Sequence, residues 1–244
     1  MPPTPPDSIL GGVGPGDYHA VGRSTVSLLE RWAGLGPSDD VLDVGCGPGR
    51  TAWALSEKLG DHGSFTYTGL DVVPAYIEWS LGNLGLEPER FRFHLADIRT
   101  SFYNPGGATA AEDFVFPWAD ASFDLAIATS LFTHLLPGAA VHYLSEIARI
   151  LRTGGRLFAS FFLLDARGRE AAQTGFTYPT FSCPIEHGLL HDAAVPEGGV
   201  AQDDGWLFEA LAVAGLRPAS VHPGRWKGAP GDYHQDVVVA VRPK

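Results

Sequence analysis

A glycine-rich loop with an acid before it is the feature of this sequence that could bind a charged cofactor. The run VLDVGCGPGR covers 41–50, and Gly45 and Gly47 carry no Cβ, so a ligand can approach their backbone closely. Asp43 precedes the glycines, where a carboxylate would repel a pyrophosphate but suits an ammonium group. Arg50 stands where the dinucleotide fingerprint has its third glycine. The loop therefore favours a cofactor that carries an amino acid.

Two further acids close the next two predicted strands. Asp71 ends the run TYTGLD, where its carboxylate can accept hydrogen bonds from both hydroxyls of a ribose. Asp97 ends the run FHLAD, where it can accept from an exocyclic adenine amine while Ile98 covers the ring. Because the carboxyl ends of parallel strands share one edge of a sheet, the acids and the loop predict one site for a ligand with ribose, adenine and amino-acid parts.

The elements that would position these residues are short apolar runs that alternate with amphipathic stretches. This alternation predicts an α/β fold with a single doubly wound, mostly parallel sheet of seven strands. The run 156–164 is apolar at nearly every residue, as is typical of a central strand buried on both faces. The other predicted strands are 41–44, 65–70, 91–96, 123–129, 217–222 and 236–241. The predicted helices are a lead-in helix between Asp17 and Gly34, 51–59, one that opens with Pro74 and turns Ile77, Leu81 and Leu84 inward, 139–151 and 203–214.

Two segments stand outside the alternation. Residues 1–16 hold four prolines in the first six positions and then four glycines, so we expect a flexible segment without helix or strand before a domain at 17–244. Residues 165–202 contain scattered Pro, Gly and His and are long for a plain connection. We expect an irregular, lid-like insertion there, before the last helix and on the substrate side.

The loop and the order of the elements resemble the class I S-adenosylmethionine-dependent methyltransferases over about Tyr18–Leu164. The resemblance implies a Rossmann-like fold and S-adenosylmethionine as the cofactor. It also implies cofactor-binding roles for particular residues: Asp43, Gly45 and Gly47 at the methionyl part, Asp71 at ribose, Asp97 at adenine, Val72 and Ile98 on the two sides of the ring, Thr129 beside the sulfonium, and Tyr18 folded over the cofactor. Packing against the lead-in helix is the alternative for Tyr18.

Four further runs resemble a bacterial subgroup of small-molecule methyltransferases whose acceptors vary widely. They are YNPGG at 103–107, FPWADASFD at 116–124, TSLFTHLLP at 129–137 and YLSEIARILRTGG at 143–155. We therefore expect a small-molecule acceptor. A hydroxyl oxygen of a natural product or sugar is the favoured acceptor atom, and a nitrogen or carbon atom is the alternative. A nicotinamide-dependent oxidoreductase and a non-catalytic binding protein are the competing functions.

An alcohol acceptor must lose its proton during attack, which a positioned base assists. His134 lies in the loop after the fourth strand and is the candidate base, with packing against the following helix as the alternative. Tyr103, His187, Trp226 and Asp236 are the predicted acceptor-binding residues, although core packing would explain Trp226 equally well.

Composition limits the other functions. The formal net charge of −11 disfavours nucleic acid as a partner. The opening MPPTPPDSIL lacks the pattern of a signal peptide, and no apolar run reaches the roughly 18 residues of a membrane span, so we expect a cytoplasmic protein without a membrane partner. Two cysteines cannot form a thiolate zinc site, and His187, His191 and Asp192 match no helical metal motif, so we predict no metal. The oligomeric state stays open, with a homodimer as one alternative.

Overall fold

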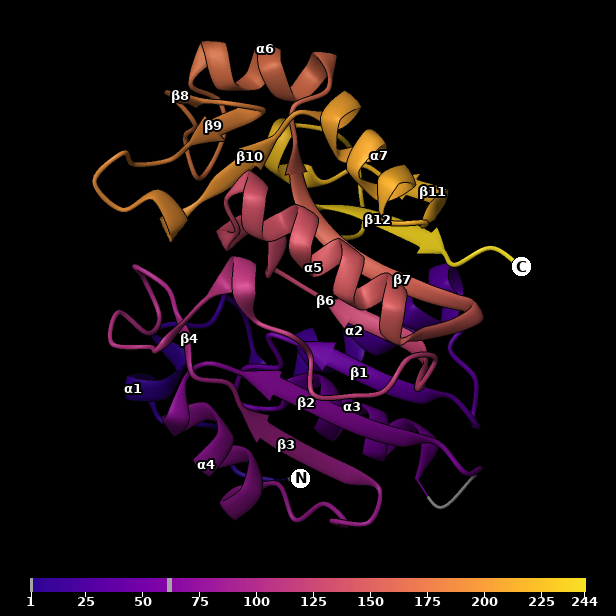
Figure 1. Ribbon diagram of the computed structural model, residues 1–244. Coiled ribbons are helices and arrows are strands. Elements are labelled where there is room, and N and C mark those ends of the chain that lie inside the picture. Colours follow the sequence, from indigo (N-terminus) through magenta and orange to yellow (C-terminus); the bar gives the residue numbers. More distant parts are fainter. Residues whose placement is uncertain (1, 61–62) are drawn as a thin grey trace.

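The computed structural model describes residues 2–60 and 63–244 (Figure 1). Within them, ten strands form the main sheet, and seven of these follow the order β3-β2-β1-β6-β7-β12-β11. The first five in this order run parallel, and β12 is antiparallel to both β7 and β11. The strand bounds are β1 (Asp40–Val44), β2 (Thr66–Asp71), β3 (Phe91–Leu95), β6 (Phe123–Ala128), β7 (Leu151–Leu163), β11 (Arg217–His222) and β12 (Asp236–Val241). The predicted doubly wound, mostly parallel sheet is confirmed.

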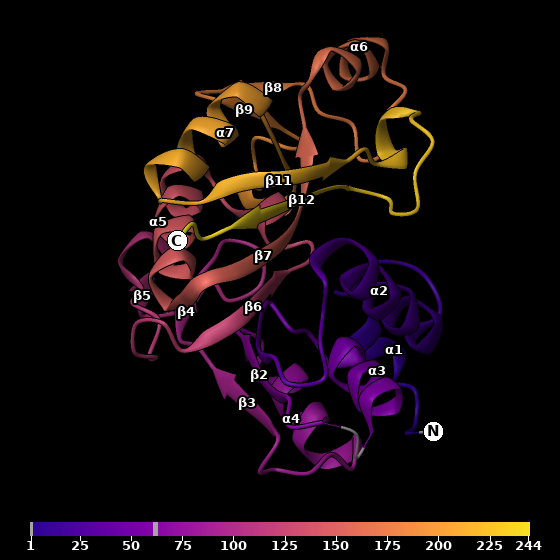
Figure 2. The ribbon, with the colours of Figure 1, turned by 90° about the vertical axis from the view of Figure 1, so that its right-hand side faces the viewer.

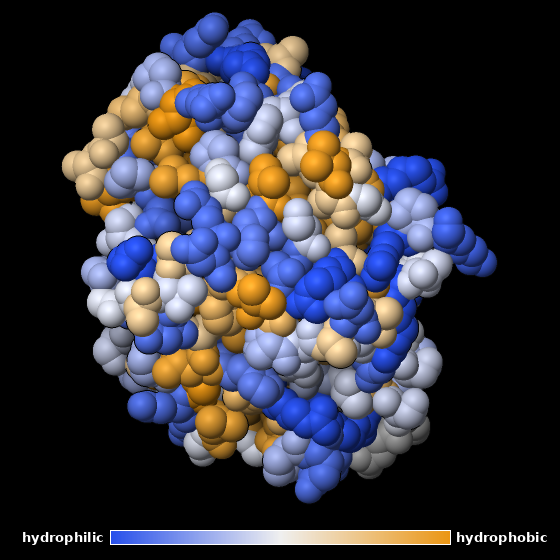
Figure 3. All heavy atoms as spheres, in the orientation of Figure 1, coloured by the Kyte–Doolittle hydropathy of each residue, from blue (hydrophilic) through white to orange (hydrophobic). Residues whose placement is uncertain are grey.

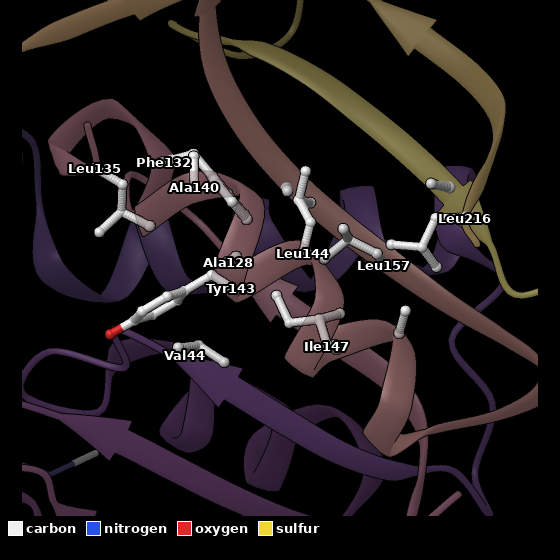
Figure 4. Packing of buried hydrophobic residues seen from close by; sticks show 14 of the residues in the cluster. Val44, Ala128, Phe132, Leu135, Ala140, Tyr143, Leu144, Ile147, Leu157 and Leu216 are labelled. Atoms are coloured by element: carbon white, nitrogen blue, oxygen red, sulfur yellow. The ribbon is translucent and has the colours of Figure 1, made fainter. Parts of the chain in front are cut away.

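Helices cover both faces of this sheet (Figure 2). Residues of α2 (Tyr18–Ala33), α3 (Arg50–Leu59) and α4 (Pro74–Asn83) pack in one apolar cluster, and residues of α5 (Pro137–Ile150) and α7 (Asp204–Val213) pack in another. Figure 4 shows part of the second cluster, in which Leu144 and Ile147 of α5 lie near Leu157 of β7. Neighbouring residues of one strand point to opposite faces of the sheet. In β1, Val41 packs in the first cluster and Leu42 in the second.

Local sequence signals account for the ends of several helices. The Asp17 side chain accepts a hydrogen bond from Ala20 N at 2.8 Å and caps α2, which Gly34 ends in the left-handed conformation. Pro74 opens α4 as predicted. The sequence predicts that Leu81 turns inward, but 65% of its surface is exposed, so it faces solvent. The seventh strand of the chain begins at Leu151, five residues before the predicted start, because the turn after α5 already pairs with the sheet.

The insertion at 165–202 is not irregular. It contains α6 (Ala166–Thr174), β8 (Cys183–Ile185), β9 (Gly188–Leu190), η3 (Pro196–Gly198) and β10 (Val200–Gln202). Strand β10 pairs in parallel with the last residues of β7, and β9 and β8 follow, so these strands extend the main sheet beyond the predicted seven. The prediction missed them because each strand is only three residues long and too short for a visible alternation of apolar residues.

The opening segment is also more ordered than predicted, because it forms the one-turn helix α1 (Asp7–Leu10). In Figure 1, α1 and β4 (Ile98–Arg99) lie at the edge of the molecule toward which the arrowheads of β1, β2 and β3 point. The remaining short elements are β5 (Thr109–Ala110), η1 (Ala111–Asp113), η2 (Phe132–His134) and η4 (Arg225–Lys227). The domain boundary at residue 17 stays a prediction.

The surface in Figure 3 shows small groups of hydrophobic side chains among hydrophilic ones. Within the described part of the chain, no helix is both long and apolar enough to cross a bilayer.

Candidate cofactor and acceptor site

The glycine loop connects β1 to α3 at the point where the order of the strands reverses. Gly45 N and Cys46 N both donate to Leu70 O of the neighbouring strand β2, at 2.8 and 3.1 Å. Gly45 and Gly47 have φ values of 78° and 56°, which glycine adopts without strain. A Cβ on Gly45 would lie 3.5 Å from the Leu131 side chain. The loop is therefore tied to β2 and leaves its backbone open toward the carboxyl edge of the sheet.

Asp71 ends β2 directly beside this loop. Its Oδ2 accepts from Gly47 N at 2.7 Å and its Oδ1 accepts from Val73 N at 3.0 Å. Each carboxylate oxygen keeps a lone pair after these bonds, so Asp71 can still accept from two ligand hydroxyls. The side chain is 8% exposed and lines the cavity at the sheet edge. This geometry fits the predicted ribose ligand.

A cavity lies at this edge of the sheet. It brings together most of the predicted cofactor-binding residues, namely Gly45, Gly47, Asp71, Val72, Ile98 and Thr129. A backbone cradle without side chains, a carboxylate with free lone pairs and apolar side chains match the amino-acid, ribose and adenine parts of S-adenosylmethionine. The residues present thus fit the predicted cofactor.

Asp43 does not lie in this cavity, contrary to the prediction that it binds an ammonium group. It shares the strand face of Val41, so its side chain is 1% exposed and faces the α2–α3 side of the sheet. Its Oδ2 accepts from Tyr67 OH at 2.8 Å, while Oδ1 is buried without a partner among the described residues. Burial raises the pKa of Asp43 to about 7.

Asp97 and Tyr18 also lie outside the cavity lining. Asp97 is exposed two residues beyond the end of β3, and its Oδ1 accepts from Ala108 N at 3.2 Å. Tyr18 is 2% exposed and donates from its hydroxyl to Pro48 O at 2.7 Å, beneath the glycine loop. Tyr18 therefore supports the loop from within the protein, and its predicted position over the cofactor is not observed.

His134, in η2, also lines the cavity. Its Nδ1 is 2.7 Å from Glu197 O, and its Nε2 is 3.4 Å from the Tyr103 hydroxyl. Since a carbonyl oxygen can only accept, Nδ1 carries the hydrogen and Nε2 of the neutral ring presents its lone pair on the Tyr103 side. Burial lowers the pKa of His134, which keeps the ring neutral near pH 7.

Ser130 fixes the start of the loop that carries His134. This residue has φ 56°, a conformation that non-glycine residues rarely adopt. Its N donates to Ser160 Oγ at 2.7 Å, its Oγ donates to Gln235 Oε1 at 3.0 Å, and its carbonyl accepts from Thr133 Oγ1 at 3.0 Å. The strained turn is thus held from β7, from the segment before β12 and from η2.

Three predicted acceptor-binding residues lie elsewhere. His187 stands in the β8–β9 turn, where its ring stacks on Trp206 at 5.3 Å. Trp226 is 2% exposed in a core cluster and donates to Asp236 Oδ2 at 2.6 Å. Asp236 is fully buried and also accepts from Leu163 N and Gly224 N. Asp236 and Trp226 are structural because their polar atoms are used inside the core.

Several cavity residues escaped the sequence analysis. They are Arg50, Tyr76, Thr100, Tyr143, Glu197 and the stretch 12–14. Figure 4 shows the Tyr143 hydroxyl pointing away from Leu144 and Ile147, between Val44 and Leu135. Its position on α5 follows an apolar periodicity, so the sequence gives it the appearance of an ordinary core residue. Glu197 comes from a part of the insertion with no motif. Among the described residues, no three His, Cys, Asp or Glu side chains gather as a metal site.

Comparisons with known proteins agree with this geometry. A family model described as a methyltransferase domain matches residues 41–155. Methyltransferase GfsG of Streptomyces halstedii is 34% identical over 181 residues, which are 73% of this chain and 58% of that protein. An O-methyltransferase of Pyrenophora dematioidea is 33% identical over 60% of this chain and 47% of its own length. The chain thus spans about half the length of the curated relatives it matches.

The fold also matches solved structures. The PH0226 protein from Pyrococcus horikoshii OT3 superimposes with a TM-score of 0.61 at 16% identity, over 96% of this chain and 94% of that one. At this identity the likeness shows the fold alone. The family model and the curated relatives, together with the glycine loop and the cavity beside Asp71, identify the family. The chain belongs to the class I S-adenosylmethionine-dependent methyltransferases.

Proposed function

We propose that this protein transfers a methyl group from S-adenosylmethionine to a hydroxyl oxygen of a small molecule. The observation that carries the proposal is the position of His134 in the same cavity as the glycine loop and Asp71. The hydrogen on Nδ1 is engaged by Glu197 O, so Nε2, which faces the Tyr103 hydroxyl, is the ring nitrogen that can take a proton. A base with a fixed orientation is what an alcohol acceptor requires.

The cofactor is held by the residues at the glycine-loop end of the cavity. Gly45 and Gly47 would hold the methionyl part through their backbone, Asp71 the ribose hydroxyls, and Val72 and Ile98 the adenine ring. When bound, S-adenosylmethionine supplies an electrophilic methyl group on a sulfonium. Arg50 takes the place proposed for Asp43 as the charged group at the methionyl end, where a guanidinium suits a carboxylate.

The acceptor would be held by cavity residues around His134. Tyr103 and Tyr143 bring phenol groups to the cavity lining, and Leu131 and Leu135 bring apolar side chains. His134 Nε2 would take the hydroxyl proton as the acceptor oxygen attacks the methyl carbon. The low pKa of the buried ring leaves Nε2 unprotonated before the reaction. The relative from Pyrenophora dematioidea is an O-methyltransferase, which supports oxygen as the acceptor atom.

A two-stage binding and turnover experiment tests the proposal. Calorimetric titration with S-adenosylmethionine, its demethylated product and NAD should give binding for the two sulfur compounds alone. A library of phenols, alcohols and sugars should then contain acceptors that release the demethylated product. Tight NAD binding would support an oxidoreductase, and binding without any turnover would support a non-catalytic protein. The absence of a metal requirement, the homodimer and the cytoplasmic location stay predictions.

A further inference from the structure

Glu197 is the residue through which the insertion reaches the cavity. It lies in η3, and its two polar groups contact two different segments. The backbone oxygen accepts from His134 Nδ1 at 2.7 Å, and the carboxylate accepts a short hydrogen bond from Ser101 N. The insertion therefore contacts the candidate base and the β4–β5 connection at the same time.

The β4–β5 connection is a compact turn that packs on the imidazole. Tyr103 N and Asn104 N both donate to Thr100 Oγ1, at 2.8 and 3.1 Å. The Phe102 ring lies parallel to the His134 ring at 5.9 Å and 10°, and the Tyr103 ring meets it edge-on at 5.2 Å. A hydrogen bond that holds Ser101 thus also holds the two neighbouring aromatic rings that pack on His134.

Glu197 also forms part of the wall between two cavities. Thr100, Ala111 and Glu197 line the cofactor cavity and also a second cavity between the β4–β5 connection, α5 and the insertion. Ser101, whose N donates to the Glu197 carboxylate, also lines the second cavity.

We propose that Glu197 is a positioning residue that makes His134 a base. Its carbonyl fixes the hydrogen of His134 on Nδ1, and its carboxylate clamps the 100–104 turn against the imidazole and closes the insertion over the acceptor. This inference rests on the proposed function only in giving His134 the role of base. The titratable groups that contact the imidazole or act on it are Tyr103 from the β4–β5 connection and Glu197 from the insertion.

The variants Glu197→Ala and Glu197→Gln separate the hydrogen bond between Ser101 N and the Glu197 carboxylate from the contact made by the Glu197 backbone. Both keep the carbonyl, but only Gln offers a side-chain oxygen that can accept from Ser101 N. In the cofactor-free protein, nitrogen NMR of the imidazole should show one tautomer in the wild type and in Glu197→Gln. In Glu197→Ala the carboxylate no longer ties η3 to Ser101, so the carbonyl should lose its fixed position beside Nδ1, and we expect a mixture of tautomers and a His134 pKa closer to that of a free imidazole. Glu186→Ala, an exposed position of the same insertion with an 88% exposed side chain, is the matched control.

Turnover supplies the second readout. Glu197→Ala should lower kcat about 10- to 100-fold, because a misplaced base loses its alignment, while the affinity for S-adenosylmethionine changes less than about twofold. Glu197→Gln should recover most of kcat. If Glu197→Ala keeps the single tautomer and the His134 pKa of the wild type, the proposal is overturned. The NMR readout needs no turnover, so the expected tautomer shift in a protein without methyltransferase activity would refute the proposed function and support the positioning role.

Discussion

Asp71 Oδ2 accepts a hydrogen bond from Gly47 N at 2.7 Å, and this contact joins the end of β2 to the glycine loop. One carboxylate thus shapes the loop and offers its remaining lone pairs to a ligand. The cofactor site depends on this pair of neighbouring strands at the point where the strand order reverses.

Replacing Asp71 by alanine should weaken cofactor binding. We expect the Kd for S-adenosylmethionine to rise about 10- to 100-fold, since hydrogen bonds to a charged group contribute about 1.5–3 kcal/mol. Asp97→Ala is the matched control, because Asp97 is an exposed acid outside the cavity lining and should change the Kd little. Calorimetry measures both values. An equal loss in both variants would restore the predicted adenine-binding role of Asp97.

Replacing His134 by alanine should abolish turnover of alcohols and leave cofactor affinity unchanged. General-base catalysis contributes about 10²- to 10⁴-fold, so kcat should fall by that factor. Acidic phenols, which ionise without help, should retain more activity than alcohols in the variant. A uniform loss over all acceptors would point to a structural role for His134. Steady-state kinetics with a matched alcohol and phenol distinguish the two results.

The dependence of kcat on pH in the wild type should report the titration of His134. Burial lowers the pKa of His134, so the neutral, proton-accepting ring persists below the ordinary imidazole value of about 6.5. We therefore expect kcat for an alcohol to stay level from pH 8 to about 6.5 and to fall only at lower pH. A fall that already begins above pH 7 would contradict this environment for the imidazole.

Asp43 should make stability depend on pH. Its pKa is raised from 3.8 to about 7 by burial, so between these values the folded protein binds a proton that the unfolded chain has released. The protonated Asp43 therefore makes its full contribution to the free energy of unfolding below about pH 4, and this contribution is lost as the pH rises to about 7. In Asp43→Asn this loss disappears. Urea unfolding of both proteins at pH 5 and 8 should show a larger drop for the wild type, and equal drops would refute the buried state of Asp43.

Asp236 should contribute to stability and leave acceptor binding unaffected. It pairs with Lys227 Nζ at 2.8 Å, and the Lys227 side chain is 2% exposed. Removing one partner of a buried ion pair costs about 3–5 kcal/mol, so Asp236→Ala should lower the free energy of unfolding by about that amount. The KM for the acceptor should not change at temperatures where the variant is folded. A raised KM with unchanged stability would return Asp236 to the acceptor site.

The sequence predicted the parts of the fold that long patterns specify. The bounds of β11 and β12 agree with the predicted 217–222 and 236–241, and Pro74 and Asp17 correctly mark helix starts. The three-residue strands of the insertion were missed because their pairing depends on the end of β7 and not on their own periodicity.

Within the site, the sequence indicated which residues reach the cavity where backbone position alone decides it. Gly45, Gly47 and Asp71 line the cavity, and their binding roles stay predictions. Asp43 lies outside the lining because its parity on β1 turns it toward Tyr67, and a sequence does not show which strand face borders the cavity. Trp226 and Asp236 lie outside it because their partners in the core come from distant segments. Glu197 could not be found because its contacts depend on how the insertion folds back over η2.

Transfer of an isotope-labelled methyl group from S-adenosylmethionine, followed by NMR of the product, tests the central claim most directly. For the best acceptor of the library, we predict that the label appears as an oxygen-linked methyl group and that His134→Ala makes it appear about 10²- to 10⁴-fold more slowly. A label on nitrogen or carbon, or transfer at an equal rate without His134, would contradict the proposed oxygen methylation by a histidine base.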